Sequence, residues 1–381
     1  MVISAILLGL CIGYLILILI YQWGWKSIPY YHTKGEGNAD TTVSVIIPAR
    51  NEETNLPVLV NTLLKQSYSS NKWDAVIVND HSTDNTAQVA SLAGGNIKLV
   101  NLSELITSTI IPYKKKAIET GIKYTTGKII LTTDADCKVP PNWIKTVSCF
   151  FTERTNLCAV MPVRMQPGKH FLGIFQTLDF LSLQAITAAA VHSKWHSLSN
   201  GANLAYLRQT FYEVNGFEEI DHIASGDDIL LTEKITALHP ASVQYILSRD
   251  VIVDTLPEPT WKSLFNQRIR WAGKFNHFKN TIVRIIMAWV YLFNLMLVLT
   301  PVYALWSSFE TTYILSVWLT VIIGKTFVEI IFLLPVATFF EQKSLLKWFP
   351  VMQPVHIIYT VLTGFLTIII QRPEWKGRKI K

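Results

Sequence analysis

The sequence predicts an α/β domain with a mostly parallel sheet, flanked by N-terminal and C-terminal transmembrane helices. Three observations predict this architecture. Short β-rich runs alternate with helical patterns from residue 42 onward, acidic residues follow three of the predicted strands, and apolar runs long enough to cross a bilayer lie at both ends of the chain. The composition agrees, because half of the 381 residues are hydrophobic and only 16% are charged, which is too apolar for a wholly soluble protein of this size.

The net charge and the cysteines narrow the class of protein further. The formal charge of +7 comes without a basic helix or an aromatic RNA-binding signature, so we expect a membrane surface as its partner and no nucleic acid. The four cysteines show no C-x-x-C pair and are too few for a secreted disulfide scaffold. We therefore expect free thiols in a reducing compartment.

Residues 1–22 are predicted to form an N-terminal transmembrane anchor. The run from Val2 to Tyr21 contains no charged residue and is long enough to span a bilayer as a helix. It lacks a basic leader and a small-residue cleavage motif, so a retained signal anchor is expected. Lys26 and Lys34 follow it, and because positive residues mark the cytoplasmic side of a span, the next domain is predicted to face the cytosol.

The domain predicted over residues 42–260 begins with alternating strands and helices. The expected strands are Val43–Ile47, Ala75–Val78, Ile97–Val100 and Lys128–Leu131. The expected helices are Leu56–Leu64, Thr86–Leu92 and Lys115–Tyr124. This alternation implies a parallel sheet with helices on its faces, and the ligands of such sheets bind beyond the carboxyl ends of the strands.

Acidic residues gather after three of these strands. The segments Pro48–Glu53, Asn79–Asp84 and Thr133–Asp136 follow the first, second and fourth strands. Carboxylates that surround an anionic ligand require a cation between them, so the pattern favours a site for a divalent cation and a phosphate-bearing ligand. No G-x-G-x-x-G or G-x-x-x-x-G-K-[ST] motif follows any of these strands, which argues against a dinucleotide oxidoreductase and a P-loop ATPase.

Three further segments are predicted to close the chain. Residues 261–280 have the pattern of an amphipathic helix at a membrane surface, residues 281–371 contain apolar stretches, and residues 372–381 form a basic tail. The apolar stretches are Ile282–Ser307, Thr312–Phe340 and Pro350–Gln371. A basic tail belongs in the cytosol, but three full spans after a cytosolic domain would place it outside. Either one stretch does not cross, or the predicted orientation is wrong.

Lys325 and Glu329 lie inside the second apolar stretch. Their i,i+4 spacing would bring them together on one face of a helix. Charges at this depth are costly unless they are paired or functional. The pattern leaves a structural ion pair and a transport role open.

An ordered set of motifs between Val43 and Trp271 resembles the family 2 glycosyltransferases, which have the GT-A fold. The motifs are Val45-Ile-Ile-Pro-Ala-Arg-Asn-Glu52, Asp80, Asp134-Ala-Asp136, Asn200-Gly-Ala-Asn203, Gly226-Asp-Asp228 and Gln267-Arg-Ile-Arg-Trp271. A single D-x-D is common by chance, whereas the ordered set is specific. The resemblance extends to membrane-bound members such as ceramide glucosyltransferases and polysaccharide synthases, and it implies a GT-A domain that binds a nucleotide-sugar donor.

The resemblance implies donor-binding roles for a set of residues along the strand ends. This set comprises Pro48, Arg50, Glu52, Asp80, Lys114, Asp134 and Asp136. In the family, the acid at Asp80 contacts the nucleobase, the first D-x-D acid lies near the ribose, and the second ligates Mg²⁺ or Mn²⁺ on the diphosphate. Asp134 and Asp136 are therefore the implied metal site, which suits the preference of hard cations for carboxylate oxygen. The simpler alternatives are a turn or cap for Asp80, a surface acid for Glu52 and a solvated basic face for Lys114.

Gly226-Asp227-Asp228 departs from the Glu-Asp that the family more often shows. The second acid normally acts as the catalytic base, which implies that role for Asp228 with Asp227 beside it. A carboxylate is suited to take the proton from an acceptor hydroxyl. The structural alternative is a helix cap before Ile229.

Gln267, Arg270 and Trp271 resemble the Q-x-x-R-W motif, which lies near the acceptor and the diphosphate in the family. The implied reaction is an inverting transfer of a sugar from a nucleotide donor, expected to be UDP-linked, onto a membrane-associated lipid acceptor. The chain is then expected to be an integral protein of the cell or inner membrane with a cytosolic catalytic domain. Two alternatives remain open, namely a processive polysaccharide synthase and, in a different class, a non-catalytic membrane scaffold or transporter.

Overall fold

The computed structural model describes residues 2–33, 41–105, 113–196, 198–223, 225–273, 280–306, 311–370, 374–376 and 378–379. The chain divides into two compact units. The helical unit comprises Met1–Ser27, Pro167–Ala189 and Pro257–Pro373, and the sheet unit comprises Ile28–Gln166, Ala190–Leu256 and Glu374–Lys381. Lys34, residues 274–279 of the predicted surface helix, and Ser307 and Gln371 at the ends of predicted spans lie outside the described residues.

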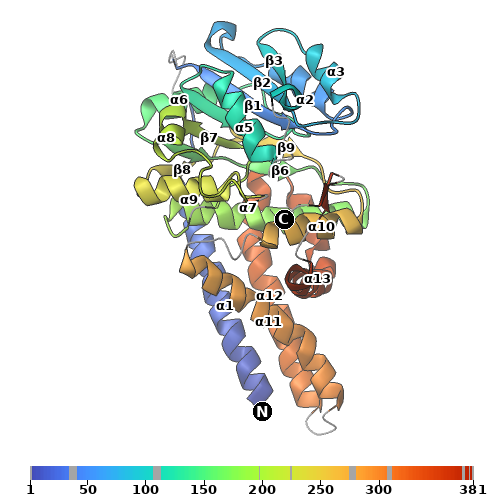
Figure 1. Cartoon of the computed structure of the whole chain (residues 1–381). Coiled ribbons are helices and arrows are strands. Elements are labelled where there is room, and N and C mark those ends of the chain that lie inside the picture. Colours follow the sequence, from blue (N-terminus) through green and yellow to red (C-terminus); the bar gives the residue numbers. More distant parts are fainter. Residues whose placement is uncertain are drawn as a thin grey trace. The chain divides into compact units, whose positions relative to one another are not determined.

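A seven-stranded mixed sheet forms the centre of the sheet unit, in the order β3-β2-β1-β4-β7-β5-β8 (Figure 1). Its strands are β1 Val43–Ala49, β2 Trp73–Asn79, β3 Ile97–Asn101, β4 Ile129–Thr132, β5 Cys158–Val160, β7 Leu204–Leu207 and β8 Val243–Tyr245. The first four strands are mutually parallel, β7 runs antiparallel to both neighbours, and β8 is parallel to β5. Two smaller pairs join β6 Val163–Met165 to β9 Val253–Thr255, and β10 Glu374–Trp375 to β11 Arg378–Lys379.

Short helices cover the sheet and complete the sheet unit. They are α2 Leu56–Leu63, α3 Thr86–Ser91, α4 Leu102–Leu105, α5 Tyr113–Lys123, α6 Trp143–Glu153, α8 Arg208–Glu213 and α9 Ile229–Leu238, with the 3-10 turns η1 Ser70–Lys72 and η2 Arg249–Val251. Burial on both faces explains the nearly continuous apolar sequence of β1 and β4. Gly121 lets α5 approach the sheet, because a Cβ there would lie 2.6 Å from Cγ2 of Ile46.

The predicted fold class is confirmed, and the differences lie in the second half of the sheet. The four predicted strands and three predicted helices each overlap an observed element within a few residues. β7 is an antiparallel strand in an otherwise mostly parallel sheet, and no local pattern predicted its direction. The four cysteines are buried free thiols, as expected.

The helical unit contains the long apolar helices (Figure 1). Its elements are α1 Val2–Ser27, α7 Phe171–His192, whose last turn belongs to the sheet unit, α10 Trp261–Ala272, α11 Thr281–Trp306, α12 Thr311–Phe339, η4 Lys343–Trp348 and α13 Phe349–Ile369. Among the described residues, five helices are long and apolar enough to cross a membrane: α1, α7, α11, α12 and the η4–α13 segment. Four overlap predicted stretches. The fifth, α7, is mostly buried inside the protein and was not predicted.

The predicted pair of Lys325 and Glu329 forms inside the helical unit. The Nζ atom of Lys325 lies 2.8 Å from Oε1 of Glu329, and Lys325 is fully buried. The Tyr14 hydroxyl and the Gln353 amide also donate to this carboxylate. The cluster therefore joins α1, α12 and α13, and several donors compensate the buried negative charge.

Candidate active site

The segments that follow β1, β2 and β4 meet at one edge of the sheet. These strands are parallel neighbours, so their carboxyl ends point the same way. Arg50, just after β1, donates from Nη1 to the backbone oxygens of Asp80 at 2.9 Å and His81 at 2.8 Å, just after β2. Pro48 lies within β1 opposite Val78 of β2. Backbone geometry and the Arg50 guanidinium thus hold the two predicted donor-binding segments together.

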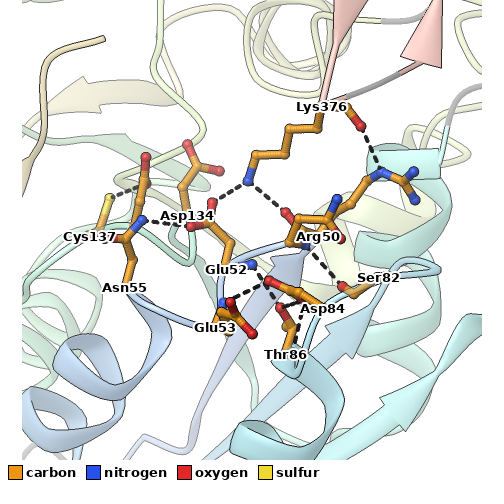
Figure 2. A network of polar contacts seen from close by, with 12 residues as sticks. Arg50, Glu52, Glu53, Asn55, Ser82, Asp84, Thr86, Asp134, Cys137 and Lys376 are labelled. Carbon is orange, nitrogen blue, oxygen red and sulfur yellow. Dashed lines mark hydrogen bonds and ion pairs between the residues drawn. The ribbon is translucent and has the colours of Figure 1, made fainter. Parts of the chain in front are cut away.

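Polar contacts fix the shape of this edge (Figure 2). Glu52 accepts a hydrogen bond from Asn55, and its backbone N–H donates to Thr86 at the start of α3. Asp84 accepts from the backbone N–H groups of Glu53 and Thr86. Burial alone would raise the pKa of Asp84, but these hydrogen bonds outweigh it and lower the pKa below its usual value. Asp84 is thus engaged in local structure, whereas the carboxylate of Asp80 contacts Nδ1 of His81 at 3.0 Å.

Glu52, Asp134 and Asp136 form an acid cluster at this edge of the sheet. Burial, and then the neighbouring carboxylates of Asp134 and Glu52, raise the pKa of Asp136 to about 7, although Lys376 lowers it. The two neighbouring carboxylates disfavour negative charge on Asp136, so positive charge beside it is favourable. The cluster therefore has the electrostatics of a cation site.

Lys114 joins this acid cluster to the Gly226-Asp-Asp228 segment. Its Nζ atom lies 2.8 Å from Oδ1 of Asp134 and 3.0 Å from Oδ2 of Asp227. Burial disfavours the charged ammonium, but the carboxylates of Asp134 and Asp227 outweigh it and raise the pKa of Lys114 well above its usual range. Gly201 borders the bridge, because a Cβ there would lie 2.8 Å from Oδ2 of Asp227 and 3.1 Å from Nζ of Lys114.

Asp228 begins helix α9 and lies beside this bridge. Its Oδ1 atom accepts from the backbone N–H of Ile229 at 2.7 Å, and its Oδ2 atom accepts from Gly201 at 3.1 Å. Gly226 has a φ of 85°, which favours glycine. Asp228 therefore caps a helix, as the structural alternative expected, and its carboxylate is also held close to the Asp227–Lys114 pair.

Gln267, Arg270 and Trp271 lie on α10 of the helical unit. Gln267 donates to Oε1 of Glu258 at 2.9 Å. Arg268, between the predicted residues, is buried, donates to Asp179 and to the Tyr359 hydroxyl at 2.8 Å each, and lies 4.2 Å over the ring of Trp271. The motif helix is thus anchored to α7 and α13 within its own unit.

Residues 44–175 match the profile of the family described as Glycosyl transferase family 2. This chain carries a family 2 glycosyltransferase domain. Its sheet resembles that of the mannosyltransferase PcManGT from Pyrobaculum calidifontis, solved in complex with GDP-Man and Mn²⁺, with a TM-score of 0.59 at 19% identity over 95% of this chain and 99% of that one. At that identity the likeness establishes a shared fold, the GT-A fold.

Curated relatives of the glycosyltransferase domain carry glycosyltransferase names. The 4,4'-diaponeurosporenoate glycosyltransferase of Staphylococcus haemolyticus is 32% identical over 225 residues, which is 58% of this chain and 57% of that protein. The undecaprenyl-phosphate 4-deoxy-4-formamido-L-arabinose transferase of Pectobacterium carotovorum is 32% identical over 103 residues, which is 27% of this chain and 31% of that protein. The chain thus spans less than two thirds of the length of these relatives.

The carboxylates of the glycosyltransferase domain suit a divalent cation whose remaining ligands come from a bound substrate. In the described part of the chain, no three His, Cys, Asp or Glu side chains gather closely enough to form a complete metal site. Mg²⁺ commonly takes one or two protein carboxylates and completes its shell with substrate phosphates and water. Asp136, with Asp134 beside it, offers such a partial set. Burial, followed by the two carboxylates, holds the pKa of the Cys137 thiol well above its usual range, which disfavours a thiolate ligand.

Sequence reasoning missed two contributors to these sites. Lys376 contacts Glu52 and Arg50 from the C-terminal hairpin, and it belongs to the stretch that was interpreted only as a basic tail. Arg268 and its partner Asp179 form a buried ion pair in the helical unit. A charged residue inside an apolar helix, such as Asp179, was the available signal for the second.

Proposed function

We propose that this chain is an integral membrane glycosyltransferase that moves a sugar from a nucleotide diphosphate donor onto a lipid acceptor with inversion at the anomeric carbon. One observation carries the proposal: the partly buried ammonium of Lys114 bridges the D-x-D acid Asp134 and the acid Asp227 next to Asp228. Segments that are distant in sequence thereby meet at one site. A nucleotide-sugar transferase needs this combination, because charge on the leaving diphosphate and a proton on the acceptor must be handled together.

The acid cluster forms the donor side of the proposed site. Asp136, with Asp134, would hold Mg²⁺ or Mn²⁺, and the bound cation would supply charge stabilisation to the leaving diphosphate. Arg50 orders the loops after β1 and β2 through its bonds to Asp80 and His81. Glu52 and Asp80 are assigned to the nucleoside, in line with the motifs.

Asp228 is the proposed base. Asp227 is ion-paired with the Lys114 ammonium at 3.0 Å, so we assign it a positioning role. Asp228 accepts hydrogen bonds from the backbone N–H groups of Ile229 and Gly201. It would remove the acceptor proton as the acceptor oxygen forms a bond to the anomeric carbon and the bond to the diphosphate breaks, leaving Asp227 and Lys114 to position it.

A membrane lipid is the proposed acceptor. Within the described residues, five helices are long and apolar enough to cross a membrane, and two relatives are named for undecaprenyl phosphate and diaponeurosporenoate. An enzyme anchored in the bilayer meets acceptors that are confined to it. Gln267, Arg270 and Trp271 on α10 are proposed to lie on the acceptor side.

A donor screen tests the proposed function. Membranes containing the full chain are incubated with Mn²⁺ and radiolabelled UDP-, GDP- or dTDP-sugars, and the label is followed into organic extracts. We expect one donor to label an extractable lipid, and Asp136→Asn and Asp228→Asn each to reduce labelling at least about 100-fold. Label in an insoluble polymer would instead favour a polysaccharide synthase, and full activity of Asp228→Asn would refute the assigned base.

A further inference from the structure

The C-terminal hairpin, β10 and β11, belongs to the sheet unit and reaches its acid cluster. Lys376 follows β10 and lies 326 residues beyond Arg50 in the sequence. Its φ of 44° is in the left-handed region that residues other than glycine seldom adopt. Such conformations persist only where surrounding contacts enforce them.

The contacts of Lys376 are made with the two predicted donor-site residues after β1 (Figure 2). Its ammonium donates to the backbone oxygen of Arg50 at 2.8 Å and forms an ion pair with Oε1 of Glu52. The Nε–H of Arg50 donates in return to the backbone oxygen of Lys376 at 3.4 Å. The Glu52 side chain is only 8% exposed, so this ion pair is shielded from water.

The charge of Lys376 affects the whole acid cluster. The ammonium bonds directly to Glu52, a member of this cluster. A divalent cation bound in the cluster would meet this positive charge in a partly desolvated site, where like charges repel strongly. Lys376 and a metal ion therefore compete for the same negative charge.

We propose that Lys376 is the resident counter-ion of the acid cluster when no donor is bound, and that the metal ion with a nucleoside diphosphate displaces it and releases the hairpin. The inference rests on the proposed function, because it takes the cluster of Glu52, Asp134 and Asp136 as the donor and metal site. The C-terminal hairpin then has a regulatory role, in which the protein's own cation closes the site until the metal and donor replace it.

Binding of Mn²⁺ alone tests the competition. Free Mn²⁺ is measured by electron paramagnetic resonance during titration of the full-length protein in detergent, without donor. Lys376→Met is expected to tighten Mn²⁺ binding about tenfold, a common size for the coupling of two ligands. Lys376→Arg, which keeps the charge, and Lys379→Met, which removes a charge elsewhere on the hairpin, should remain within about twofold of wild type. Unchanged or weaker binding by Lys376→Met overturns the proposal.

Release of the hairpin is followed by limited trypsin digestion and mass analysis of C-terminal peptides. Cleavage after Lys376 and Arg378 should be slow in the protein alone and several-fold faster with Mn²⁺ and UDP or GDP. An unchanged cleavage rate contradicts displacement.

The outcomes separate this proposal from the proposed function. If the protein transfers sugar but Lys376→Met leaves its Mn²⁺ affinity unchanged, only the counter-ion role of Lys376 is refuted. If Lys376 and Mn²⁺ compete but no donor supports sugar transfer, only the proposed transferase function is refuted. Absence of Mn²⁺ binding to wild type even in the presence of UDP or GDP counts against both.

Discussion

At the residue scale, the bridge made by Lys114 is the contact on which the proposed active site depends. Removing the ammonium with Lys114→Met leaves the carboxylates of Asp134 and Asp227 facing each other without a cation. We expect transfer activity to fall about 100-fold or more, because the charges that position the proposed base and donor are no longer balanced.

Lys116→Met is the matched control for this change. Lys116 lies on the same helix, but its partner is Glu119 at 3.3 Å and its side chain is 38% exposed, so an effect below about twofold is expected. The measurement is kcat/KM for transfer, with thermal unfolding to confirm folding. Equal losses in both variants would show that the bridge has no special role.

Gly201 is a second residue where a small change should have a large effect. A methyl group in Gly201→Ala would lie 2.8 Å from Oδ2 of Asp227 and 3.1 Å from Nζ of Lys114, too close for either to stay in place. We expect at least about a tenfold loss of transfer activity. Gly9→Ala is the control, because nothing lies within 4 Å of its added Cβ. Wild-type activity of Gly201→Ala would contradict the described geometry.

His196 gives a pH dependence of stability. Burial lowers its pKa to about 4, against about 6.5 in an unfolded chain. Between pH 6.5 and pH 4 the unfolded state binds a proton that the folded state excludes, so stability falls as pH decreases through this window, by about 3 kcal/mol in total. Above pH 6.5 this contribution to the pH dependence vanishes.

His196→Gln should flatten this part of the stability profile. The check is the unfolding midpoint of both proteins at pH 7.5 and pH 5 in detergent. If wild type and variant lose the same stability between these pH values, His196 does not carry the effect.

Only those residues of the proposed site that belong to a sequence motif could be predicted from the sequence. Asp134, Asp136 and Asp228 stand in ordered motifs next to strand or helix ends, so the sequence located them. Lys376 could not be located this way, because its contact with Glu52 depends on tertiary folding across more than 300 residues. Likewise, Lys114 stood out in the sequence, but its bridge to Asp227 exists only in the folded chain.

At the scale of elements, the buried Lys325–Glu329 cluster connects three helices through hydrogen bonds and an ion pair. Tyr14 of α1 and Gln353 of α13 donate to the same carboxylate that pairs with Lys325 of α12. These contacts give the pair a packing role, which weakens the case for transport. Lys325→Met would leave Glu329 charged and without its counter-ion, a loss expected to cost about 3–5 kcal/mol.

The double variant Lys325→Met/Glu329→Gln tests this role. It removes both charges and should recover a large part of the lost stability. Thermal unfolding in detergent is the measurement. A single variant as stable as wild type would contradict a fastening role.

Element prediction succeeded where local pattern and topology agree. The runs that become β1 and β2 are apolar because both faces of the sheet are covered. The direction of β7 is set by its partners β4 and β5, which lie far away in the sequence. Similarly, α7 combines apolar residues with buried polar ones such as Gln176 and Thr177, so its pattern is that of neither a surface helix nor a simple span.

At the scale of the whole molecule, the side of the membrane on which the C-terminus lies limits the number of helices that can cross. The ion pair between Lys376 and Glu52 requires the tail and the sheet unit to be on one side. An even number of crossings must then lie between Leu256 and the tail. At least one of α11, α12 and α13 is therefore expected not to cross, which would resolve the conflict between the predicted spans and the basic tail.

The arrangement of the helical unit favours α13 as that helix. Figure 1 shows α1, α11 and α12 running lengthwise, whereas α13 is viewed nearly end-on. Side chains of α13 also join it to the two helices that carry Asp179 and Arg268: His356 lies 3.3 Å from Asp179, and Tyr359 accepts from Arg268. Buried charges also lie on α12, so the direction of α13 relative to α1, α11 and α12 is the observation that favours an interfacial position.

We therefore predict three crossings, by α1, α11 and α12, with the tail and the sheet unit on the same face. Single cysteines are introduced at Lys379, at Lys98 on exposed β3, and at Trp306 at the end of α11, against a background of four buried native thiols. A membrane-impermeant maleimide added to oriented vesicles should label Lys379→Cys and Lys98→Cys from one side and Trp306→Cys from the other. Labelling of Lys379→Cys and Lys98→Cys from opposite sides would mean that α13 crosses, and the contact of Lys376 with Glu52 could not form in the membrane.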